Sequence, residues 1–192
     1  MGLGNPGPEY ADTRHNAGFR LADRLAERWG FRPFRRGERA RETSGTVDGT
    51  PVKLLKPLTY MNRSGAAVAP LRALPGFDPA QHLLILVDEV ALPLGRFRLR
   101  GAGSAGGHNG LKSVEQAIGN QEYARLRIGV GPSEERRGIY KNLADFVLAP
   151  FAKDEREDVL ALMPSLENAV DIWIREGIER AMNAHNRRPT ES

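Results

Sequence analysis

The chain has 192 residues, a net charge of +4 and a pI of about 9.7, with 40% hydrophobic and 27% charged residues. This balance predicts one globular domain and excludes a disordered chain or a coiled coil. The absence of cysteine excludes disulfides, thiolate catalysis and sulfur-rich metal sites. With no signal-peptide pattern and no apolar run of roughly 18 to 20 residues, the sequence predicts a cytoplasmic protein without a membrane partner.

The first elements in chain order are a helix and a hairpin. Apolar residues recur at helical spacing over Ala17–Trp29, and Gly30 is suited to end this helix. The runs Thr43–Val47 and Pro51–Leu55 flank Asp48-Gly49, a dipeptide typical of primed turns. We therefore expect an antiparallel hairpin after the first helix.

A further helix and two strands follow. Residues Ser64–Leu74 are expected to be helical, with Pro70 producing a kink or a restart. Leu83–Val87 is a continuous apolar run, which is typical of a strand covered on both faces. Gly95–Arg100 alternates arginine with apolar residues and so predicts a strand with one wet, basic face.

The rest of the chain predicts alternating helices and strands. A glycine-rich loop, Gly101–Gly107, leads into a helix at Leu111–Ile118 and a strand at Leu126–Val130. From Phe151 onward the pattern is helical, with an expected interruption at Pro164. Strands interleaved with helices predict an α/β fold with a central mixed sheet.

Arginine supplies most of the basic charge, and guanidinium groups suit phosphate better than a point charge does. A nucleic-acid partner and a merely solvated basic surface are both compatible with this pattern. The clusters are Arg35-Arg36, Arg96/Arg98/Arg100, Arg125/Arg127 and Arg187-Arg188.

Two segments, Gly2–Gly7 and Gly101–Gly106, match the dinucleotide-binding pattern G-x-G-x-x-G. In the first, Pro6 removes a backbone donor and Pro8 delays any helix. The second follows the basic strand, whereas a Rossmann unit requires a buried parallel one. Neither continues as a P-loop. We interpret both as backbone permissiveness and predict no nucleotide cofactor, or any other cofactor.

Histidine and asparagine recur together next to predicted turns. Each asparagine alone is most simply explained by turn chemistry, and each histidine by a local hydrogen bond. Their joint occurrence with an aspartate at the end of an apolar strand predicts a hydrogen-bonding cleft with one base. No histidine spacing predicts a metal site, and no Gly-x-Ser-x-Gly elbow supplies a nucleophile. The residues are Asn5, Asn16, Asn62, Asn109, His15, His108 and Asp88.

In combination, these motifs resemble the bacterial-type peptidyl-tRNA hydrolase family. The resemblance runs in order from Gly2 to about Asn186. Its blocks are Gly2–Gly7, Tyr10, Thr13–Gly18, Thr59–Gly65, Asp88, Leu92-Pro93, Gly103–Lys112 and Arg125–Gly131. It implies a monomeric, single-domain protein over residues 1–192, with three α/β/α layers around a mixed, mostly parallel sheet. We expect a disordered tail after about residue 187.

The resemblance also implies the reaction, the hydrolysis of peptidyl-tRNA to free peptide and tRNA. His15 matches the family's catalytic histidine and Asp88 the carboxylate that orients it. The implied substrate-binding residues are Asn5, Tyr10, Tyr60, Met61, Asn62, His108 and Asn109. The implied tRNA-binding residues are Arg100 and Arg127, contacting the acceptor stem and CCA end, and we add Arg98 because it alternates with Arg100 on the same basic strand. Neither a metal nor an obligate protein partner is implied.

The implied chemistry is physically reasonable, because an ester is a far easier target than an amide. An unperturbed histidine, with a pKa of about 6.5, is mostly neutral in the cytoplasm and can accept a proton from water. General-base assistance typically accelerates a reaction by a factor of roughly 10² to 10⁴. A hydrogen bond to Asp88 would fix the tautomer of His15, with water taking the place of the serine of a triad.

Three departures from the family pattern stand out. Only Met1 precedes the first glycine motif, so we expect the central strand there to be shortened. Ala91 stands where the family commonly has a second aspartate, which should reduce polar support near Asp88. Pro70 could alter how the preceding segment presents Asn62.

Two alternative functions stay open at this point. A non-catalytic RNA-binding module would keep the basic strand, although a stacking platform would need more than 7% aromatic residues. A small-ester or nucleoside-processing enzyme is possible on a related scaffold, because fold does not fix function. The arginine-rich strand favours a larger anionic substrate.

Overall fold

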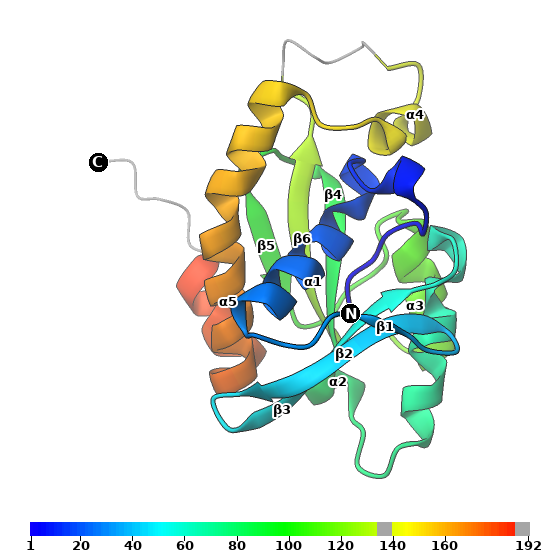
Figure 1. Ribbon diagram of the computed structural model, residues 1–192, viewed down its shortest axis with the longest axis vertical. Helices are drawn as coiled ribbons and strands as arrows, with labels where there is room; N and C mark the ends of the chain where they lie inside the picture. Colours follow the sequence, from blue (N-terminus) through cyan, green and yellow to red (C-terminus); the bar gives the residue numbers. More distant parts are fainter. Residues whose placement is uncertain (134–139, 187–192) are drawn as a thin grey trace.

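The computed structural model describes residues 1–133 and 140–186 (Figure 1). Its α-helices are α1 (Ala17–Arg28), α2 (Pro79–His82), α3 (Asn109–Ile118), α4 (Leu143–Leu148) and α5 (Lys153–His185). Its strands are β1 (Arg35–Arg36), β2 (Ala40–Val47), β3 (Thr50–Pro57), β4 (Leu84–Pro93), β5 (Phe97–Arg100) and β6 (Ala124–Gly131). Four 3-10 helices are η1 (Pro8–Tyr10), η2 (Arg14–Asn16), η3 (Met61–Ala67) and η4 (Ala69–Ala73). The tail expected to be disordered lies outside the described residues.

The strands form two three-stranded sheets, ordered β1-β2-β3 and β4-β6-β5, and the N-terminal segment runs between them. On one side the Leu3 amide donates to the Leu86 carbonyl, and the Leu86 amide donates to the Met1 carbonyl. On the other side the Gly2 amide donates to the carbonyl of Leu55 in β3. The expected shortened strand is thus a single parallel bridge, from Gly2 to Leu86, which links the two sheets.

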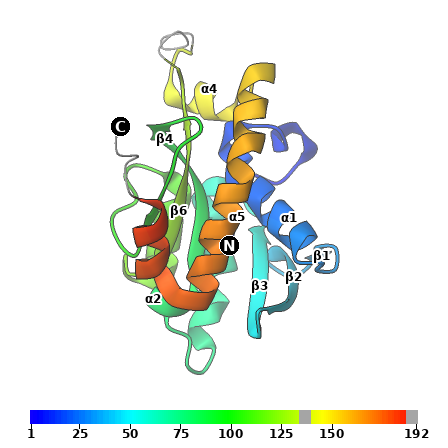
Figure 2. The ribbon, with the colours of Figure 1, turned by 90° about the vertical axis from the view of Figure 1, so that its left-hand side faces the viewer.

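Helices cover both faces of the β4-β6-β5 sheet, which gives the expected α/β/α layers (Figures 1 and 2). Within β4, Leu84 and Leu86 belong to a core cluster shared with α1 and α5. Their neighbours Ile85 and Val87 belong to a second cluster shared with η3 and α3. Since successive side chains of a strand alternate between faces, the uninterrupted apolar run packs against both helical layers.

The strand directions confirm a mixed central sheet, in which the parallel pairings are β4 with β6 and Gly2 with Leu86. β4 pairs with β6 in parallel, whereas β5 pairs with β6 antiparallel and the β1-β2-β3 sheet is antiparallel throughout. The β2-β3 pair confirms the expected hairpin, because a tight turn joins β2 directly to β3 and only antiparallel strands can be joined in that way. Asp48 and Gly49 in that turn both have positive φ, 47° and 83°, as a primed turn requires.

The expected helix over Ser64–Leu74 is instead a pair of 3-10 helices, η3 and η4. Pro70 lies in the first turn of η4, so the prediction of a restart is confirmed. In η3, Gly65 packs so closely on α3 that a Cβ at this position would lie 2.1 Å from the Ser113 carbonyl oxygen. η3 is therefore fitted to α3 rather than shaped by its own propensity.

The predicted interruption of the last helix at Pro164 is wrong. α5 continues through Pro164, and the non-helical residue is Gly177, with φ 83° and ψ 178°. Pro164 is exposed, and Leu160, whose carbonyl loses its helical partner there, is 62% exposed. Water can solvate that carbonyl, so the helix tolerates the proline. Among the helices of the described ranges, none is both long and apolar enough to cross a bilayer.

Candidate active site

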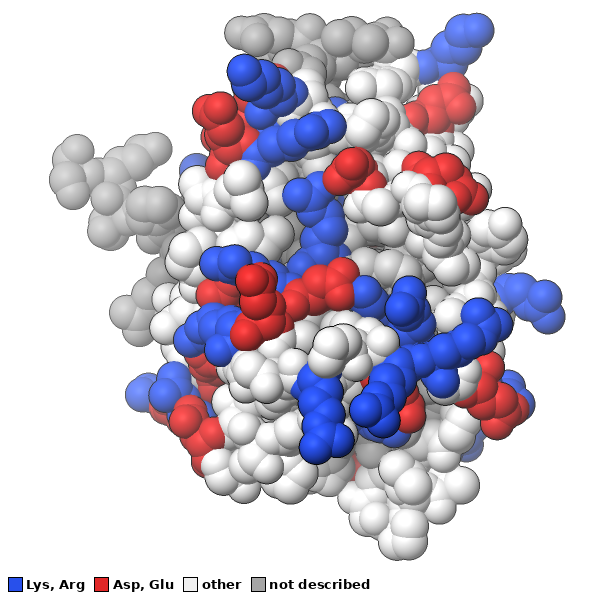
Figure 3. Space-filling view, viewed as in Figure 1, with Lys and Arg blue, Asp and Glu red and all other residues white. Residues whose placement is uncertain are grey.

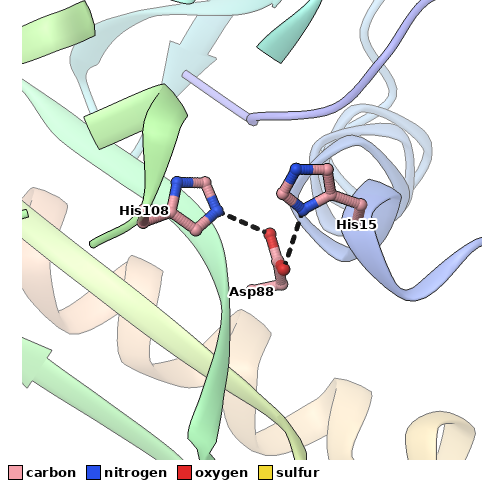
Figure 4. Close-up of side chains that lie close together, drawn as sticks. All are labelled: His15, Asp88 and His108. Carbon is pink, nitrogen blue, oxygen red and sulfur yellow. Dashed lines mark hydrogen bonds and ion pairs between the residues drawn. The ribbon is translucent and has the colours of Figure 1, made fainter. Parts of the chain in front are cut away.

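Three side chains from distant parts of the chain meet where the parallel pairing of β4 and β6 ends (Figure 4). Asp88 comes from β4, His15 from η2, and His108 directly precedes α3. His15 Nδ1 lies 2.9 Å from Asp88 Oδ2, and His108 Nε2 lies 3.0 Å from Asp88 Oδ1. One carboxylate is thus held between two imidazole rings, whose centroids are 5.2 Å apart.

His108 is fixed in place by its position at the start of α3. Its Nδ1 accepts hydrogen bonds from the backbone amides of Gly110 and Leu111, at 3.1 and 3.3 Å. A ring nitrogen that accepts carries no proton, so the proton of the neutral ring belongs on Nε2, which donates to Asp88. The preceding loop turns through Gly106 and Gly107, both at positive φ (58° and 87°), which confirms that these glycines serve backbone geometry.

Asp88 is almost fully buried and ionised. Burial by itself raises the pKa of a carboxyl group, but the hydrogen bonds from His108 and His15, together with the electrostatic interaction with the two rings, outweigh it and lower the pKa of Asp88 to about 2. An ionised carboxylate can only accept, so His15 donates to it from Nδ1. The other ring nitrogen, Nε2, then keeps its lone pair and can take a proton from a nearby group.

Asn5 forms one wall of the site and is itself held on three sides. Its amide N–H donates to Asn16 Oδ1 at 2.8 Å, and Asn16 Nδ2 donates back to the Asn5 carbonyl at 3.0 Å. Asn5 Oδ1 accepts from the backbone amide of Met61 at 2.8 Å. Within the described residues Asn5 Nδ2 makes no hydrogen bond, so this donor is available to a ligand. Asn16 had been noted in the sequence, but its part in fixing Asn5 had not been predicted.

These groups line one cleft of about 450 Å³. Asn5, His15, Asp88, His108 and Asn109, all predicted as site residues, lie in its wall. The opposite side is apolar and comes from α4, which the sequence reasoning missed. Leu143 and Leu148 of α4 border the cleft and are 59% and 41% exposed, a feature that only the structure shows. The remaining lining residues are Glu89, Val90, Gly106, Gly107, Ala144 and Val147.

Four other predicted residues lie beside the cleft rather than in its wall. Tyr10 and Tyr60 pack edge to face, with ring centroids 6.3 Å apart, and Tyr60 is 59% exposed. Met61 is buried and acts through its backbone bond to Asn5, while the following residue, Asn62, is exposed on η3. Of the four, Met61 is linked to the site by a hydrogen bond, through Asn5.

The predicted basic residues sit on one face of the β5-β6 pair. Arg98 and Arg127 are cross-strand partners, and Arg98 and Arg100 are exposed. Arg127 is partly neutralised, because it pairs with Glu89 and donates to the Ser104 carbonyl at 2.8 Å. Glu89 also accepts from the Ala91 amide at 3.1 Å, which supplies some of the polar support expected to be missing there.

The same three polar groups could be considered for a metal, since ligand atoms of His15, Asp88 and His108 lie within 4.8 Å of one another. However, the nitrogens facing Asp88 carry protons in this network, and His108 Nδ1 is used by α3. A metal would have to displace these hydrogen bonds. The donor set therefore fits a proton-transfer site better than a metal site.

Comparison with known proteins gives a consistent result along the whole chain. A sequence model described as peptidyl-tRNA hydrolase matches residues 1–192. The chain is 50% identical over 187 residues to a peptidyl-tRNA hydrolase of Gemmatimonas aurantiaca, covering 97% of this chain and 98% of that protein. It is 44% identical over 188 residues to one of Chloroflexus aurantiacus, with 97% of each chain covered.

Solved structures agree with these sequence comparisons. A peptidyl-tRNA hydrolase crystallised with N-propanol superposes with a TM-score of 0.85 at 34% identity, covering 98% of this chain and 94% of that one. The Acinetobacter baumannii peptidyl-tRNA hydrolase superposes with a TM-score of 0.83 at 36% identity, covering 95% and 90%.

Proposed function

This chain belongs to the peptidyl-tRNA hydrolase family, and from that premise we propose that it cleaves the ester bond between a peptide and tRNA, with His15 as general base. The observation that carries the assignment of the base is the hydrogen bond from His15 Nδ1 to the buried Asp88 carboxylate. We propose further that the protein acts as a cytoplasmic monomer without an obligate protein partner.

The proposed first step is the removal of a proton from water by His15 Nε2. As that proton arrives the ring becomes an imidazolium, and the adjacent Asp88 carboxylate stabilises the new positive charge. Asp88 is suited to this role because it stays ionised: its pKa is lowered to about 2. The hydroxide equivalent attacks the ester carbonyl to give a tetrahedral intermediate. When the C–O bond to the tRNA breaks, the leaving 3′ oxygen takes the proton back from His15 Nε2, so that the tRNA departs with a free hydroxyl, the peptide departs with a free carboxyl group, and the ring is neutral again.

The developing negative charge on the carbonyl oxygen needs hydrogen-bond donors. Asn5 Nδ2 and the amide of Asn109 are the candidates, since both residues line the cleft with His15. A well-aimed donor of this kind contributes roughly 3 kcal/mol to lowering the barrier. Tyr10, Tyr60, Met61 and Asn62 would act around the reacting groups, and the apolar side of the cleft on α4 suits a peptide.

Arg98 and Arg100 are the proposed tRNA contacts, because both are exposed on one face of β5. Arg127 would join them if the phosphate of the acceptor stem competes with Glu89. Phosphate contacts position an RNA without reading its sequence, which suits an enzyme acting on many tRNAs.

The decisive test is His15→Ala, assayed with N-acetylaminoacyl-tRNA. We expect kcat to fall by roughly 10² to 10⁴, while tRNA binding measured by filter retention stays near the wild-type value. The matched control is His82→Ala, which removes a histidine outside the cleft. Wild-type kcat in the His15 variant would rule out His15 as the base.

The same assay separates the two alternative functions. A non-catalytic RNA-binding module would retain the tRNA without releasing its acyl group. A small-ester or nucleoside-processing enzyme would prefer a simple ester, or a nucleoside with phosphate, over the acylated tRNA.

A further inference from the structure

A second cavity, of about 660 Å³, lies on the other side of the Asn5 wall. It shares Asn5 with the catalytic cleft and is bounded by η1, α1 and the β1-β2-β3 sheet. Four cationic side chains line it, Arg20, Arg36, Arg41 and Lys56, against one carboxylate, Asp23. We call it the cationic cavity. Its position next to Asn5 means that a substrate leaving the cleft on this side would enter it.

Three of the cations form a row across the sheet. Arg36 is the cross-strand partner of Arg41, and Arg41 is the cross-strand partner of Lys56. Directly opposed side chains face the same side of a sheet, and like charges in that arrangement are destabilising. The row therefore carries a cost to folding that an anion in the cavity would offset.

Internal carboxylates neutralise only part of this charge. Lys56 pairs with Asp23, and Arg20 lies 3.7 Å from Asp12. Arg36 and Arg41 are exposed and form no ion pair within the described part of the chain. Figure 3 shows basic side chains gathered over the β1–β3 region of this face. Two adjacent guanidinium groups are thus left for a ligand.

We propose that the cationic cavity is a second phosphate-binding site, which takes phosphodiester groups of the substrate RNA close to its esterified 3′ end. This inference rests on the proposed function, because the RNA is attached to the ester at His15. Guanidinium groups bind phosphate oxygens in bidentate fashion, and two opposed arginines can hold one phosphodiester.

The rest of the lining supports an RNA ligand. Phe19, Pro57 and Leu58 give the cavity an apolar side that can pack against a ribose or a base. The cleft itself has its apolar side on α4, beyond His15. The RNA end and the peptide would accordingly leave the reacting ester in different directions, the RNA past Asn5 and the peptide along α4.

The test compares Arg36→Ala, Arg41→Ala and Arg36→Glu with the control Arg35→Ala. Arg35 neighbours Arg36 on β1 but lines a different hollow and lies opposite Glu42. Each variant is assayed on N-acetylaminoacyl-tRNA and on N-acetylaminoacyl-adenosine, which has the same ester but no phosphate. Arg36→Glu would place opposite charges across β1 and β2, so it should fold at least as stably as wild type while losing the anion site.

We expect Arg36→Ala and Arg41→Ala to raise KM for the tRNA substrate roughly tenfold and to reduce the slope of log KM against log salt by about 1. Arg36→Glu should have a larger effect on KM. None of the three should change kcat/KM for the adenosine ester, and Arg35→Ala should match wild type on both substrates.

Two results would overturn the inference while leaving the proposed function intact. One is a KM and salt slope in the Arg36 and Arg41 variants equal to those of Arg35→Ala. The other is an equal rise in KM for both substrates, which would assign the cavity to the acyl group instead of phosphate. Failure of the wild-type protein to cleave either ester would reject the proposed function, and this inference with it.

Discussion

At the scale of single residues, one buried carboxylate organises the site. Asp88 accepts from two imidazoles, and each of them is constrained elsewhere: His108 by the first turn of α3 and His15 by its place in η2. Burying an unpaired charge would be costly, but two hydrogen bonds to charged or polar rings compensate for it. The geometry that holds His15 is therefore also what makes the buried charge tolerable.

The first prediction concerns Asp88 and acid stability. Its pKa is about 2 in the folded protein and 3.8 ordinarily, so the unfolded chain binds the proton more tightly. The lowered pKa contributes about 2 kcal/mol to the free energy of unfolding. This contribution is present above about pH 4 and is lost as the pH falls from about 4 to about 2. Asp88→Asn should lack this component. Urea unfolding of both proteins at pH 6, 4 and 3 measures it, and parallel pH profiles would contradict the assignment.

The second prediction concerns Tyr123, which is fully buried under the guanidinium of Arg125, 4.1 Å from its ring centroid. Burial raises the pKa of Tyr123 to about 12, and its hydroxyl makes no hydrogen bond in the described part of the protein. Tyr123→Phe should therefore leave the free energy of unfolding unchanged or raise it by up to about 1 kcal/mol. Tyr123→Leu, which removes the ring, should lower it by about 2 kcal/mol. A loss in the Phe variant as large as in the Leu variant would mean that the hydroxyl is bonded.

At the scale of elements, the site depends on close packing between η3 and α3. Gly65 brings the two into contact: its amide donates to Ser113 Oγ at 2.9 Å. η3 begins with Met61, whose backbone amide holds Asn5. A displacement of η3 would therefore move Asn5, although no residue of η3 itself lines the cleft.

The third prediction tests this route with Gly65→Ala. The added Cβ would lie 2.1 Å from the Ser113 carbonyl oxygen, a backbone atom that cannot turn aside. We expect a loss of about 3 kcal/mol in unfolding free energy. We also expect kcat/KM to fall, because the shift of η3 would displace Asn5. The control is Gly101→Ala, where the nearest atom is the Ile178 side chain at 3.5 Å. Equal stability of the two variants would show that η3 can move away from α3.

The sequence predicts elements whose pattern is local and misses features that depend on tertiary contact. The helix predicted over Ala17–Trp29 and the hairpin turn at Asp48-Gly49 are confirmed, because periodicity and turn chemistry act within a few residues. η3 was mistaken for part of an α-helix, since the contact of Gly65 with Ser113 is invisible in the sequence. Pro164 was mistaken for a break, since its exposure could not be known.

The site shows the same division. The strand-end position of Asp88 and its meeting with His15 and His108 were predicted, largely because the motifs carry them. The α4 side of the cleft was not, because a six-residue helix has too few turns for a periodic signal.

At the scale of the whole molecule, the N-terminal region and the region of α4 and α5 meet beside the site. Arg14, one residue before His15, is buried and reaches the segment between α4 and α5. Its Nη1 donates to the carbonyls of Ala149 and Pro150, at 3.2 and 2.9 Å, and its Nη2 pairs with Glu155 at 2.6 Å. The guanidinium also lies 4.5 Å from the centroid of Phe146 in α4. One arginine thus joins η2, which carries the proposed base His15, to the apolar side of the cleft.

The last prediction follows from this arrangement and concerns Arg14→Lys. The planar fork of arginine serves two carbonyls and a carboxylate at once, whereas an ammonium cannot reach all three from the same position. Because Glu155 would be left buried with a weakened partner, we expect a loss of about 3 kcal/mol in unfolding free energy. The control, Arg180→Lys, alters an exposed pair with Glu176 and should cost under about 0.5 kcal/mol. Since α4 and η2 are held together by the same guanidinium, kcat/KM should fall in Arg14→Lys even where the protein is fully folded. Equal stability and equal activity in the two variants would mean that η2 and α4 are held together by their apolar packing alone.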